Sequence, residues 1–461
     1  MPSRRATMSE LTTTIAAVST PPGKGGVAVI RLSGAEAFDI ASRVFRPRGK
    51  TAPQDAPRRA IYGDFLCDGV AVDDGLATAF PAPASYTGED TVELSCHGGM
   101  LITKTILGAL FAAGASPAAA GEFTRRAYLS GRLGLSEAEA IATLLEAKSE
   151  AQIRLSANRG LFAERVMALY GEALSLVSAA EAVIDFPEED LSEIGEDEFL
   201  ARLSSLTDSV AKLCATWRTG QAVSEGIRTV IVGRPNVGKS SLYNLLLCED
   251  AAIVSDKAGT TRDILERTVP LGRVLLRLYD TAGLRSATDE RELIGVDRAR
   301  RAMQEADLIL AVFDTSAPLT EEDHALLREL ATLGATKIAI LNKSDLTAVS
   351  TVPAEGFAAT VTLSAKHGTT EVLSAEIDRL FTDGDIVIGE AAIVSSARQY
   401  AALTRAHECL MQAKNALTMG HPADMYLFDL CEALSALGEV DGRTVGEEIV
   451  SEIFSHFCVG K

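Results

Sequence analysis

The chain has 461 residues and a formal net charge of −19 at pH 7. This length exceeds what one hydrophobic core usually supports and predicts about three domains. The composition, with 47% apolar and 23% charged residues, is that of an ordinary soluble globular protein. A strongly acidic surface repels phosphate backbones, so any nucleic acid must bind at a local basic patch or through a partner protein.

Targeting and disulfide signals are absent from the sequence. Charged residues interrupt every apolar run before the ~18 residues of a membrane span. The N-terminus lacks the continuous apolar core and cleavage site of a secretory signal. The seven cysteines are scattered singly without a CxxC pair, which argues against a disulfide framework or a zinc site. We therefore expect a cytoplasmic protein without a membrane span.

The first part of the chain predicts a small domain followed by helices. Residues 1–130 mix short strand-like runs, such as VAVIRLS and TVELSC, with Gly/Pro turns, which indicates an α+β domain. From Ser136 the sequence is rich in alanine and leucine, which predicts an all-α segment over residues 131–222. Apolar side chains there fall on one helix face: Val166, Leu169, Tyr170, Ala173, Leu174 and Val177.

Residues 223–384 predict an α/β domain. The near-continuous apolar strands RTVIVG, RVLLRLYD, DLILAVFD, KIAILN and ATVTLSA alternate with helical segments. This pattern is typical of a parallel sheet that is covered on both faces. Residues 385–461 are helical again, so the simplest architecture is an α/β domain inserted into a helical domain made of two chain segments, 131–222 and 385–461.

A phosphate-binding loop follows the first strand of this domain. The sequence GRPNVGKS, residues 233–240, lies between the strand RTVIVG and the helix SSLYNLLL. Its glycines let backbone N–H groups turn toward the β-phosphate, and the helix N-terminus adds positive potential. We expect Lys239 to bridge the β- and γ-phosphates and the Ser240 hydroxyl to ligate Mg²⁺.

Guanine recognition is predicted at the ends of two later strands. The motif NKSD, residues 342–345, ends KIAILN, and the Asp345 carboxylate can accept hydrogen bonds from both N1–H and the N2 amino group of guanine. Adenine lacks this pair of donors, so such a site rejects it. Ser364-Ala365-Lys366 ends the next strand, where a backbone N–H can reach the guanine O6.

Two further motifs complete a GTPase set. Asp280-Thr281-Ala282-Gly283 ends RVLLRLYD, so Asp280 can hold Mg²⁺ through water and the Gly283 N–H can meet the γ-phosphate. Thr261 is the natural second hydroxyl on Mg²⁺. Together these motifs predict GTP binding.

The usual catalytic glutamine is missing. Many GTPases place a water-orienting glutamine directly after DTAG, but here this residue is Leu284, which cannot position water. The following segment offers Asp289, Glu290 and Glu292 instead. Asn236 in the phosphate loop carries an extra oxygen that can help to hold a monovalent cation, although a neutral loop filler is the alternative.

Long motifs connect the chain with a known family. They are TPPGKGGVAVIRLSG, SYTGEDTVELSCHGG, GEFTRRAYLSGRLGL, AVIDFPEED, GRPNVGKSSL, IVSDKAGTTRD, DTAGLR and the terminal FSHFCVGK. Over nearly its whole length the chain resembles the MnmE/TrmE tRNA modification GTPases. The terminal FCVGK is highly specific, because no fold requires a cysteine and a lysine at a chain end.

The resemblance implies an architecture and a function. The architecture is a folate-binding N-terminal domain that forms a homodimer, an all-α domain in two segments, and an inserted Ras-like P-loop GTPase domain. The implied function is the addition of an aminomethyl or carboxymethylaminomethyl group at carbon 5 of the wobble uridine of certain tRNAs. It implies as partners an FAD-dependent protein of the MnmG/GidA type and tRNA, with 5-formyltetrahydrofolate or a related tetrahydrofolate as the one-carbon donor.

The resemblance also assigns residues. Folate contacts fall on Arg31, Glu93, Arg132, where lysine is usual, and Lys461. Glu292 becomes the water-orienting acid, and Cys458 a cysteine with a chemical role, against the alternative of simple burial. The Mg²⁺ ligands are Ser240 and Thr261; the K⁺ site is formed by Asn236, Ser255, Lys257 through its carbonyl, and Thr260. Nucleotide contacts extend over Asn236, Val237, Gly238, Lys239, Ser240, Ser241, Ser255, Asp256, Lys257, Ala258, Gly259, Thr260, Thr261, Asp280, Thr281, Ala282, Gly283, Asn342, Lys343, Asp345, Ser364, Ala365 and Lys366.

Two other functions are open at this point. A ribosome-assembly GTPase of the Era or Der type carries an RNA-binding module or a second GTPase domain, but residues 385–461 contain neither a GxxG RNA loop nor a second phosphate loop. A non-catalytic nucleotide switch that scaffolds the FAD-dependent partner is the second alternative, with folate as a structural ligand only.

Overall fold

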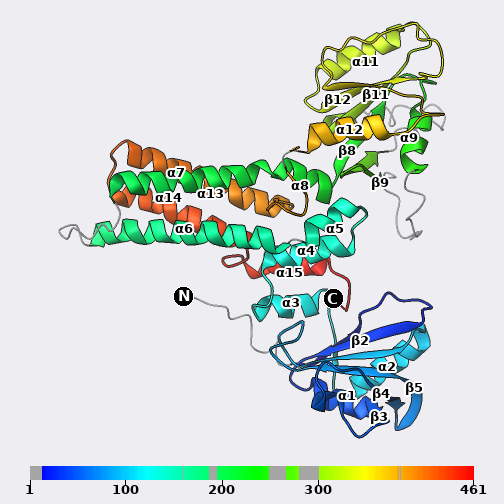
Figure 1. The fold of residues 1–461 in the computed structure, drawn as a ribbon, viewed down its shortest axis with the longest axis vertical. Helices are drawn as coiled ribbons and strands as arrows, with labels where there is room; N and C mark the ends of the chain where they lie inside the picture. Colours follow the sequence, from blue (N-terminus) through cyan, green and yellow to red (C-terminus); the bar gives the residue numbers. More distant parts are fainter. Residues whose placement is uncertain are drawn as a thin grey trace. The chain divides into compact units, whose positions relative to one another are not determined.

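The computed structural model describes residues 13–157, 159–185, 195–248, 266–279, 301–382, 384 and 386–460. By its contacts the chain divides into two compact units, the first formed by residues 1–142 with 438–461 and the second by residues 143–437 (Figure 1). By these contacts residues 438–460 lie in the first unit, and the predicted domain boundaries stay predictions.

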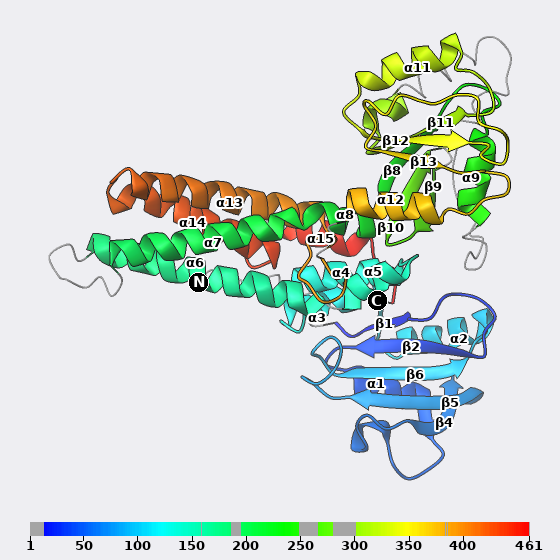
Figure 2. The same ribbon diagram turned by 45° about the horizontal axis from the view of Figure 1, so that its top comes forward.

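The first unit is built on a seven-stranded sheet in the order β3-β4-β5-β6-β2-β1-β7. All described pairs are antiparallel except β1 with β7. Helices α1 and α2 bury their apolar sides against one face of this sheet (Figure 2). The strands are β1 (Ile15–Val18), β2 (Val27–Ser33), β3 (Phe45–Pro47), β4 (Ile61–Cys67), β5 (Val70–Phe80), β6 (Thr91–His97) and β7 (Ser116–Pro117), and the helices are α1 (Ala37–Val44) and α2 (Met100–Ala112).

Alternation along the strands explains this layer. On β2, the side chains of Ala28, Ile30 and Leu32 are buried in the core shared with α1 and α2, and Arg31 between them points to the other face. The predicted α+β fold of the N-terminal region is confirmed.

The end of the chain belongs to the same unit. Helices α3 (Glu122–Leu129), α4 (Leu135–Leu145) and α15 (Glu447–Ser455) meet around Phe454 and Phe457, which pack on Leu135. Beyond α15, Val459 forms a β-bridge with Ala120, and the Ser19 hydroxyl donates to the Gly460 carbonyl at 2.9 Å. These bonds attach the C-terminal segment to the end of β1.

The helical part of the second unit confirms a domain made of two chain segments. Helices α6, α7, α13 and α14 run side by side (Figures 1 and 2). The Phe199 and Tyr426 rings lie 5.8 Å apart, and the Trp217 and Tyr400 rings stack at 5.1 Å, so each pair joins the two segments. The helices are α5 (Glu150–Ala157), α6 (Arg159–Asp185), α7 (Glu196–Ala215), α8 (Trp217–Ser224), α13 (Ala397–Thr418) and α14 (Ala423–Val440).

One helix within the described residues passes a simple test for a membrane span. By length and composition alone, residues Gly160–Asp185 of α6 are apolar enough to cross a bilayer. Core helices of soluble proteins pass the same test. Charged residues such as Glu172 interrupt this stretch, and Leu169, Ala173 and Leu176 are buried on one of its sides.

The α/β part of the second unit is a six-stranded sheet in the order β13-β12-β11-β8-β10-β9. Its strands are parallel except for β9, which is antiparallel to β10. All seven residues of β11 are buried, as expected for a strand with packed layers on both faces. The elements are β8 (Ile227–Val232), α9 (Lys239–Cys248), β9 (Glu266–Leu271), β10 (Val274–Tyr279), β11 (Leu308–Asp314), α11 (Glu321–Ala331), β12 (Thr336–Asn342), β13 (Ala359–Thr362) and α12 (Glu371–Phe381). The predicted P-loop fold is confirmed.

Candidate nucleotide site

The carboxyl edge of the parallel sheet brings three predicted motifs together. The central strand β8 leads into residues 233–240, β12 ends at Asn342, and β13 is followed by residues 364–366. The strands β10 and β11 lie on opposite sides of β8, so the chain leaves β8 at the point where strand order reverses. Parallel α/β sheets bind ligands in the crevice at this point.

The phosphate loop has the conformation that its glycines predict. Gly233, Asn236 and Gly238 have φ values of 149°, 63° and 104°. A Cβ on Gly233 would lie 2.5 Å from the carbonyl oxygen of Val312, so the loop can approach β11 this closely only without a side chain. Asparagine is among the few other residues that adopt a left-handed conformation readily. Asn236 is exposed at this position of the loop.

Lys239 lies over this loop. Its Nζ donates hydrogen bonds to the carbonyl oxygens of Gly233 at 2.9 Å and of Arg234 at 2.7 Å. Ser240 and Ser241 follow in the first turn of α9, and both are exposed. The amine and hydroxyl groups expected to meet phosphate and Mg²⁺ thus lie at the N-terminus of one helix, where the helix dipole favours an anion.

Asn342 connects the phosphate loop with the base-recognition segments. Its side chain is buried; Nδ2 donates to the Val237 carbonyl at 2.7 Å, and Oδ1 accepts from the Ala365 N–H at 2.9 Å. The Ala365 N–H, one candidate donor to the guanine O6, therefore already has a partner within the protein. One asparagine thus sets the spacing of three loops that are far apart in the sequence.

Asp345 is the acid that is predicted to recognise guanine. The Asp345 side chain is exposed. Its pKa lies below the ordinary value, chiefly because of the Ser364 hydroxyl and then because of a backbone N–H. An ionised carboxylate offers two acceptor oxygens for the N1–H and the N2 amino group. Lys366, at the end of the loop that contains Ser364, is exposed.

Several predicted ligands lie outside the described residues. They are Ser255, Asp256, Lys257, Ala258, Gly259, Thr260, Thr261, Asp280, Thr281, Ala282, Gly283, Glu292 and Lys461. Of the predicted metal ligands, the described ones are the Ser240 hydroxyl and the Asn236 amide. Both offer oxygen, the ligand that hard cations such as Mg²⁺ prefer.

The predicted folate residues lie in the first unit. Arg31 on β2 stands directly opposite Glu93 on β6, and its Nε and Nη2 donate to Glu93 Oε1 at 3.0 and 2.8 Å. The guanidinium also lies 5.1 Å from the centroid of the Tyr86 ring, a cation–π distance. Arg132 and Cys458 are both exposed. Burial, the alternative for Cys458, is therefore not what the structure shows.

Known proteins match almost the entire chain. Residues 14–132 match the family described as the GTP-binding protein TrmE N-terminus, and residues 135–458 match the MnmE helical domain. The tRNA modification GTPase MnmE of Heliobacterium modesticaldum is 42% identical over 97% of this chain and 99% of its own length. The chain belongs to the MnmE family of tRNA modification GTPases.

Another member of the MnmE family, from Lactiplantibacillus plantarum, is 39% identical over 97% of this chain and 98% of its own length. Among solved structures, Era in complex with MgGDPNP and 16S ribosomal RNA is 26% identical over 40% of this chain and 66% of that chain, with a TM-score of 0.26. Membership of the MnmE family makes the protein a tRNA modification GTPase and decides against both a ribosome-assembly GTPase and a non-catalytic scaffold.

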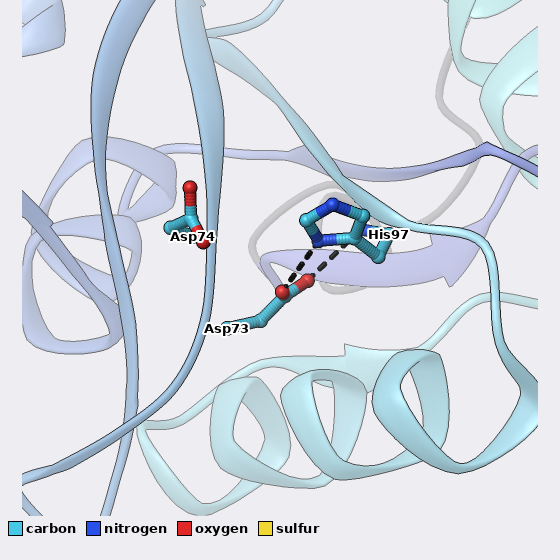
Figure 3. Close-up of side chains that lie close together, drawn as sticks. All are labelled: Asp73, Asp74 and His97. Atoms are coloured by element: carbon cyan, nitrogen blue, oxygen red, sulfur yellow. Dashed lines mark hydrogen bonds and ion pairs between the residues drawn. The ribbon is translucent and has the colours of Figure 1, made fainter.

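Sequence patterns did not indicate one polar cluster in the N-terminal domain of this MnmE family member. The Asp73 carboxylate pairs with His97 Nδ1 at 2.7 Å and accepts from the His97 backbone N–H at 2.9 Å (Figure 3). Asp73 thereby raises the pKa of His97. Asp74 nearby accepts a hydrogen bond from Tyr62. Each carboxylate thus has a protein partner, which explains the cluster as part of the sheet surface. The pairing of β4 with β5 shifts register between Phe65 and Leu66, next to the position where Phe65 pairs with Asp73.

Proposed function

We propose that this protein hydrolyses GTP in a K⁺-dependent reaction and modifies the wobble uridine of certain tRNAs. With an FAD-dependent partner of the MnmG/GidA type, it adds an aminomethyl or carboxymethylaminomethyl group at carbon 5. Membership of the MnmE family, over almost the whole chain, is the observation that carries this proposal. A cytoplasmic location follows from the substrate.

Two features of the GTPase domain support the dependence on potassium. Leu284 replaces the glutamine that orients water in many GTPases, so hydrolysis needs other groups. Asn236, in the phosphate loop, is exposed and has a φ of 63°. When bound, K⁺ supplies positive charge next to the phosphates, where negative charge develops during transfer. We assign it to Asn236 together with Ser255, Lys257 and Thr260, and we assign the orientation of water to Glu292.

GTP turnover is expected to be at least about tenfold faster in KCl than in NaCl at equal ionic strength. Asn236→Ala is expected to abolish this difference while the protein still binds GTP. Asn415→Ala is the matched control, because Asn415 is exposed on α13 of the helical part. Equal turnover of the unaltered protein in both salts would refute the K⁺ site, as would full stimulation in Asn236→Ala.

The first unit supports a folate site. We propose that 5-formyltetrahydrofolate or a related tetrahydrofolate binds at Arg31, Glu93, Arg132 and Lys461. The guanine-like donor edge of a pteridine suits the carboxylate of Glu93, and cations suit the glutamate tail. The C-terminal segment reaches the end of β1, and Ala17 of β1 pairs with Arg31 of β2, so residues from both ends of the chain meet in this unit. In this proposal the same domain forms the homodimer.

Deletion of the gene is expected to remove the carbon-5 group from wobble uridines in the affected tRNAs. Mass analysis of nucleosides from total tRNA measures this directly. The unaltered gene should restore the modification, whereas Lys239→Ala should not, because its product lacks the amine that is expected to bridge the phosphates. Normal wobble uridines in the deletion strain would contradict the proposed reaction and leave the GTPase assignment intact.

A further inference from the structure

A buried carboxylate lies between the phosphate loop and the guanine-recognition loop. Asp314 is the last residue of β11, and it pairs in register with Asn342, the last residue of β12. Only 8% of its side chain is exposed. This carboxylate therefore lies at the edge of the sheet where the nucleotide binds, although it belongs to none of the GTPase motifs.

Asp314 holds the lysine of the NKSD motif. Lys343 Nζ donates to Asp314 Oδ2 at 2.6 Å, and the other oxygen, Oδ1, accepts from the Ser316 N–H and hydroxyl. Burial raises the pKa of Asp314, but the hydrogen bonds from Lys343 and Ser316 outweigh this effect and hold the pKa below its ordinary value. Lys343 itself has a φ of 67°, an unusual conformation for a lysine, which the surrounding contacts must maintain.

The same carboxylate faces the phosphate loop. The Arg234 guanidinium approaches Asp314 Oδ2 at 3.9 Å, and its Nε donates to Asp323 Oδ2 at 3.0 Å. Asp323 is 2% exposed and forms the capping box of α11 with Thr320. The guanidinium is thus anchored on the first turn of a helix. The backbone carbonyl of Arg234 accepts the hydrogen bond from Lys239, so the anchored residue also supports the phosphate-binding lysine.

The geometry assigns to Asp314 the role of a positioning residue for the bound nucleotide. Asp314 fixes the distance between the loop that holds the phosphates and the loop that recognises the base. Its one buried carboxylate attracts Arg234 from the first loop and Lys343 from the second. Asp314 acts through Lys343 and Arg234 and does not touch the nucleotide. The proposal rests on GTP binding and is independent of the potassium, folate and tRNA assignments.

This role makes a specific prediction for binding and turnover. GTP and GDP share the base, the sugar and two phosphates, so a wrong loop spacing should weaken both equally. Asp314→Asn is expected to raise the Kd of GDP and of GTP by the same factor, roughly 10- to 100-fold, the scale of a lost charge-assisted hydrogen bond. Turnover at saturating GTP should stay within about threefold, because the phosphate that is transferred is positioned by other groups.

Asp307 provides a matched control in the same part of the fold. It precedes β11 at the opposite edge of the sheet and also pairs with an arginine, since Arg228 Nε and Nη2 donate to it at 2.9 and 2.8 Å. Asp307→Asn should therefore lower the free energy of unfolding by a similar amount and leave the Kd values of GDP and GTP unchanged. Fluorescence titration with labelled GDP and GTP, and thermal unfolding of the nucleotide-free proteins, measure these quantities.

A second variant covers the case in which Asp314→Asn does not fold. Arg234→Gln changes a loop residue outside the sheet core and should also raise the Kd of GDP and GTP together. Unchanged affinity in a folded Asp314→Asn protein would overturn the proposal, and so would equal weakening by Asp307→Asn or a loss confined to GTP. Failure of the unaltered protein to bind GDP would overturn the GTPase assignment itself, so the two failures are distinguishable.

Discussion

Gly238→Ala is expected to weaken the binding of both GTP and GDP by roughly 10²- to 10³-fold. Gly238 has a φ of 104°, which a residue with a side chain adopts only with strain, at a cost of about 1–3 kcal/mol. An added Cβ would also lie 2.1 Å from Nδ2 of Asn342. Because that amide donates to the Val237 carbonyl, its displacement breaks a buried hydrogen bond, at a further cost of about 1–3 kcal/mol.

The substitution should weaken nucleotide binding without unfolding the domain, because the added Cβ collides with Asn342 within the nucleotide site. Titration of GDP into each protein measures the affinity, and circular dichroism checks that the fold remains. Gly334→Ala is the matched control: Gly334 lies in the same unit, is exposed, and has no atom within 4 Å of an added Cβ. Wild-type affinity in Gly238→Ala would show that the phosphate loop and Asn342 do not need this close approach.

Much of the GTPase domain could be predicted, because its signals are local. The run DLILAVFD predicts a buried strand, and all residues of β11 are buried. The glycines of the phosphate loop predict a backbone that other residues avoid, and Gly233 and Gly238 have positive φ values. Near-continuous apolar runs similarly indicated β8 and β12, and the motifs at their ends then had to meet at one edge of the parallel sheet.

Pairings between distant residues could not be predicted in this way. Arg234 and Asp323 are 89 positions apart, and nothing in the sequence around either indicates the other. The packing of Phe454 on Leu135, which places the last part of the chain in the first unit, depends on a tertiary arrangement that periodicity does not contain. Arg31 and Glu93 were assigned from the resemblance, but their direct pairing depends on the register of β2 and β6.

The register of a sheet and the partner of a charged side chain both depend on which parts of the chain pack together in the folded protein. A local sequence pattern therefore predicts neither of them. The network around Asp314 shows the consequence for function. Arg234 and Lys343 lie in two recognised motifs, yet only the folded chain shows that both face the carboxylate of Asp314.

Asp345→Asn is expected to lower the affinity for guanine nucleotides by about 10³-fold or more and to create affinity for xanthosine nucleotides. The Asp345 carboxylate is expected to accept from N1–H and from the N2 amino group, and its pKa lies below the ordinary value. An amide presents an N–H₂ donor where guanine also has a donor, so one hydrogen bond is replaced by repulsion. A site that is built to form such hydrogen bonds binds a ligand without the matching groups roughly 10⁴- to 10⁵-fold more weakly. This factor is the upper limit of the loss of affinity that we expect.

Xanthine has a carbonyl oxygen at carbon 2, which can accept from the new amide. Competition between labelled GDP and unlabelled GDP, XDP or ADP measures the change in each protein. The gain of XDP binding is the decisive readout, because a misfolded variant cannot acquire a new ligand. Glu355→Gln, which neutralises an exposed acid before β13, is the control and should keep guanine selectivity. Asp314→Asn should keep it too, since it changes the spacing of the loops and not the groups that face the base. Unaltered guanine selectivity in Asp345→Asn would show that another residue recognises the base.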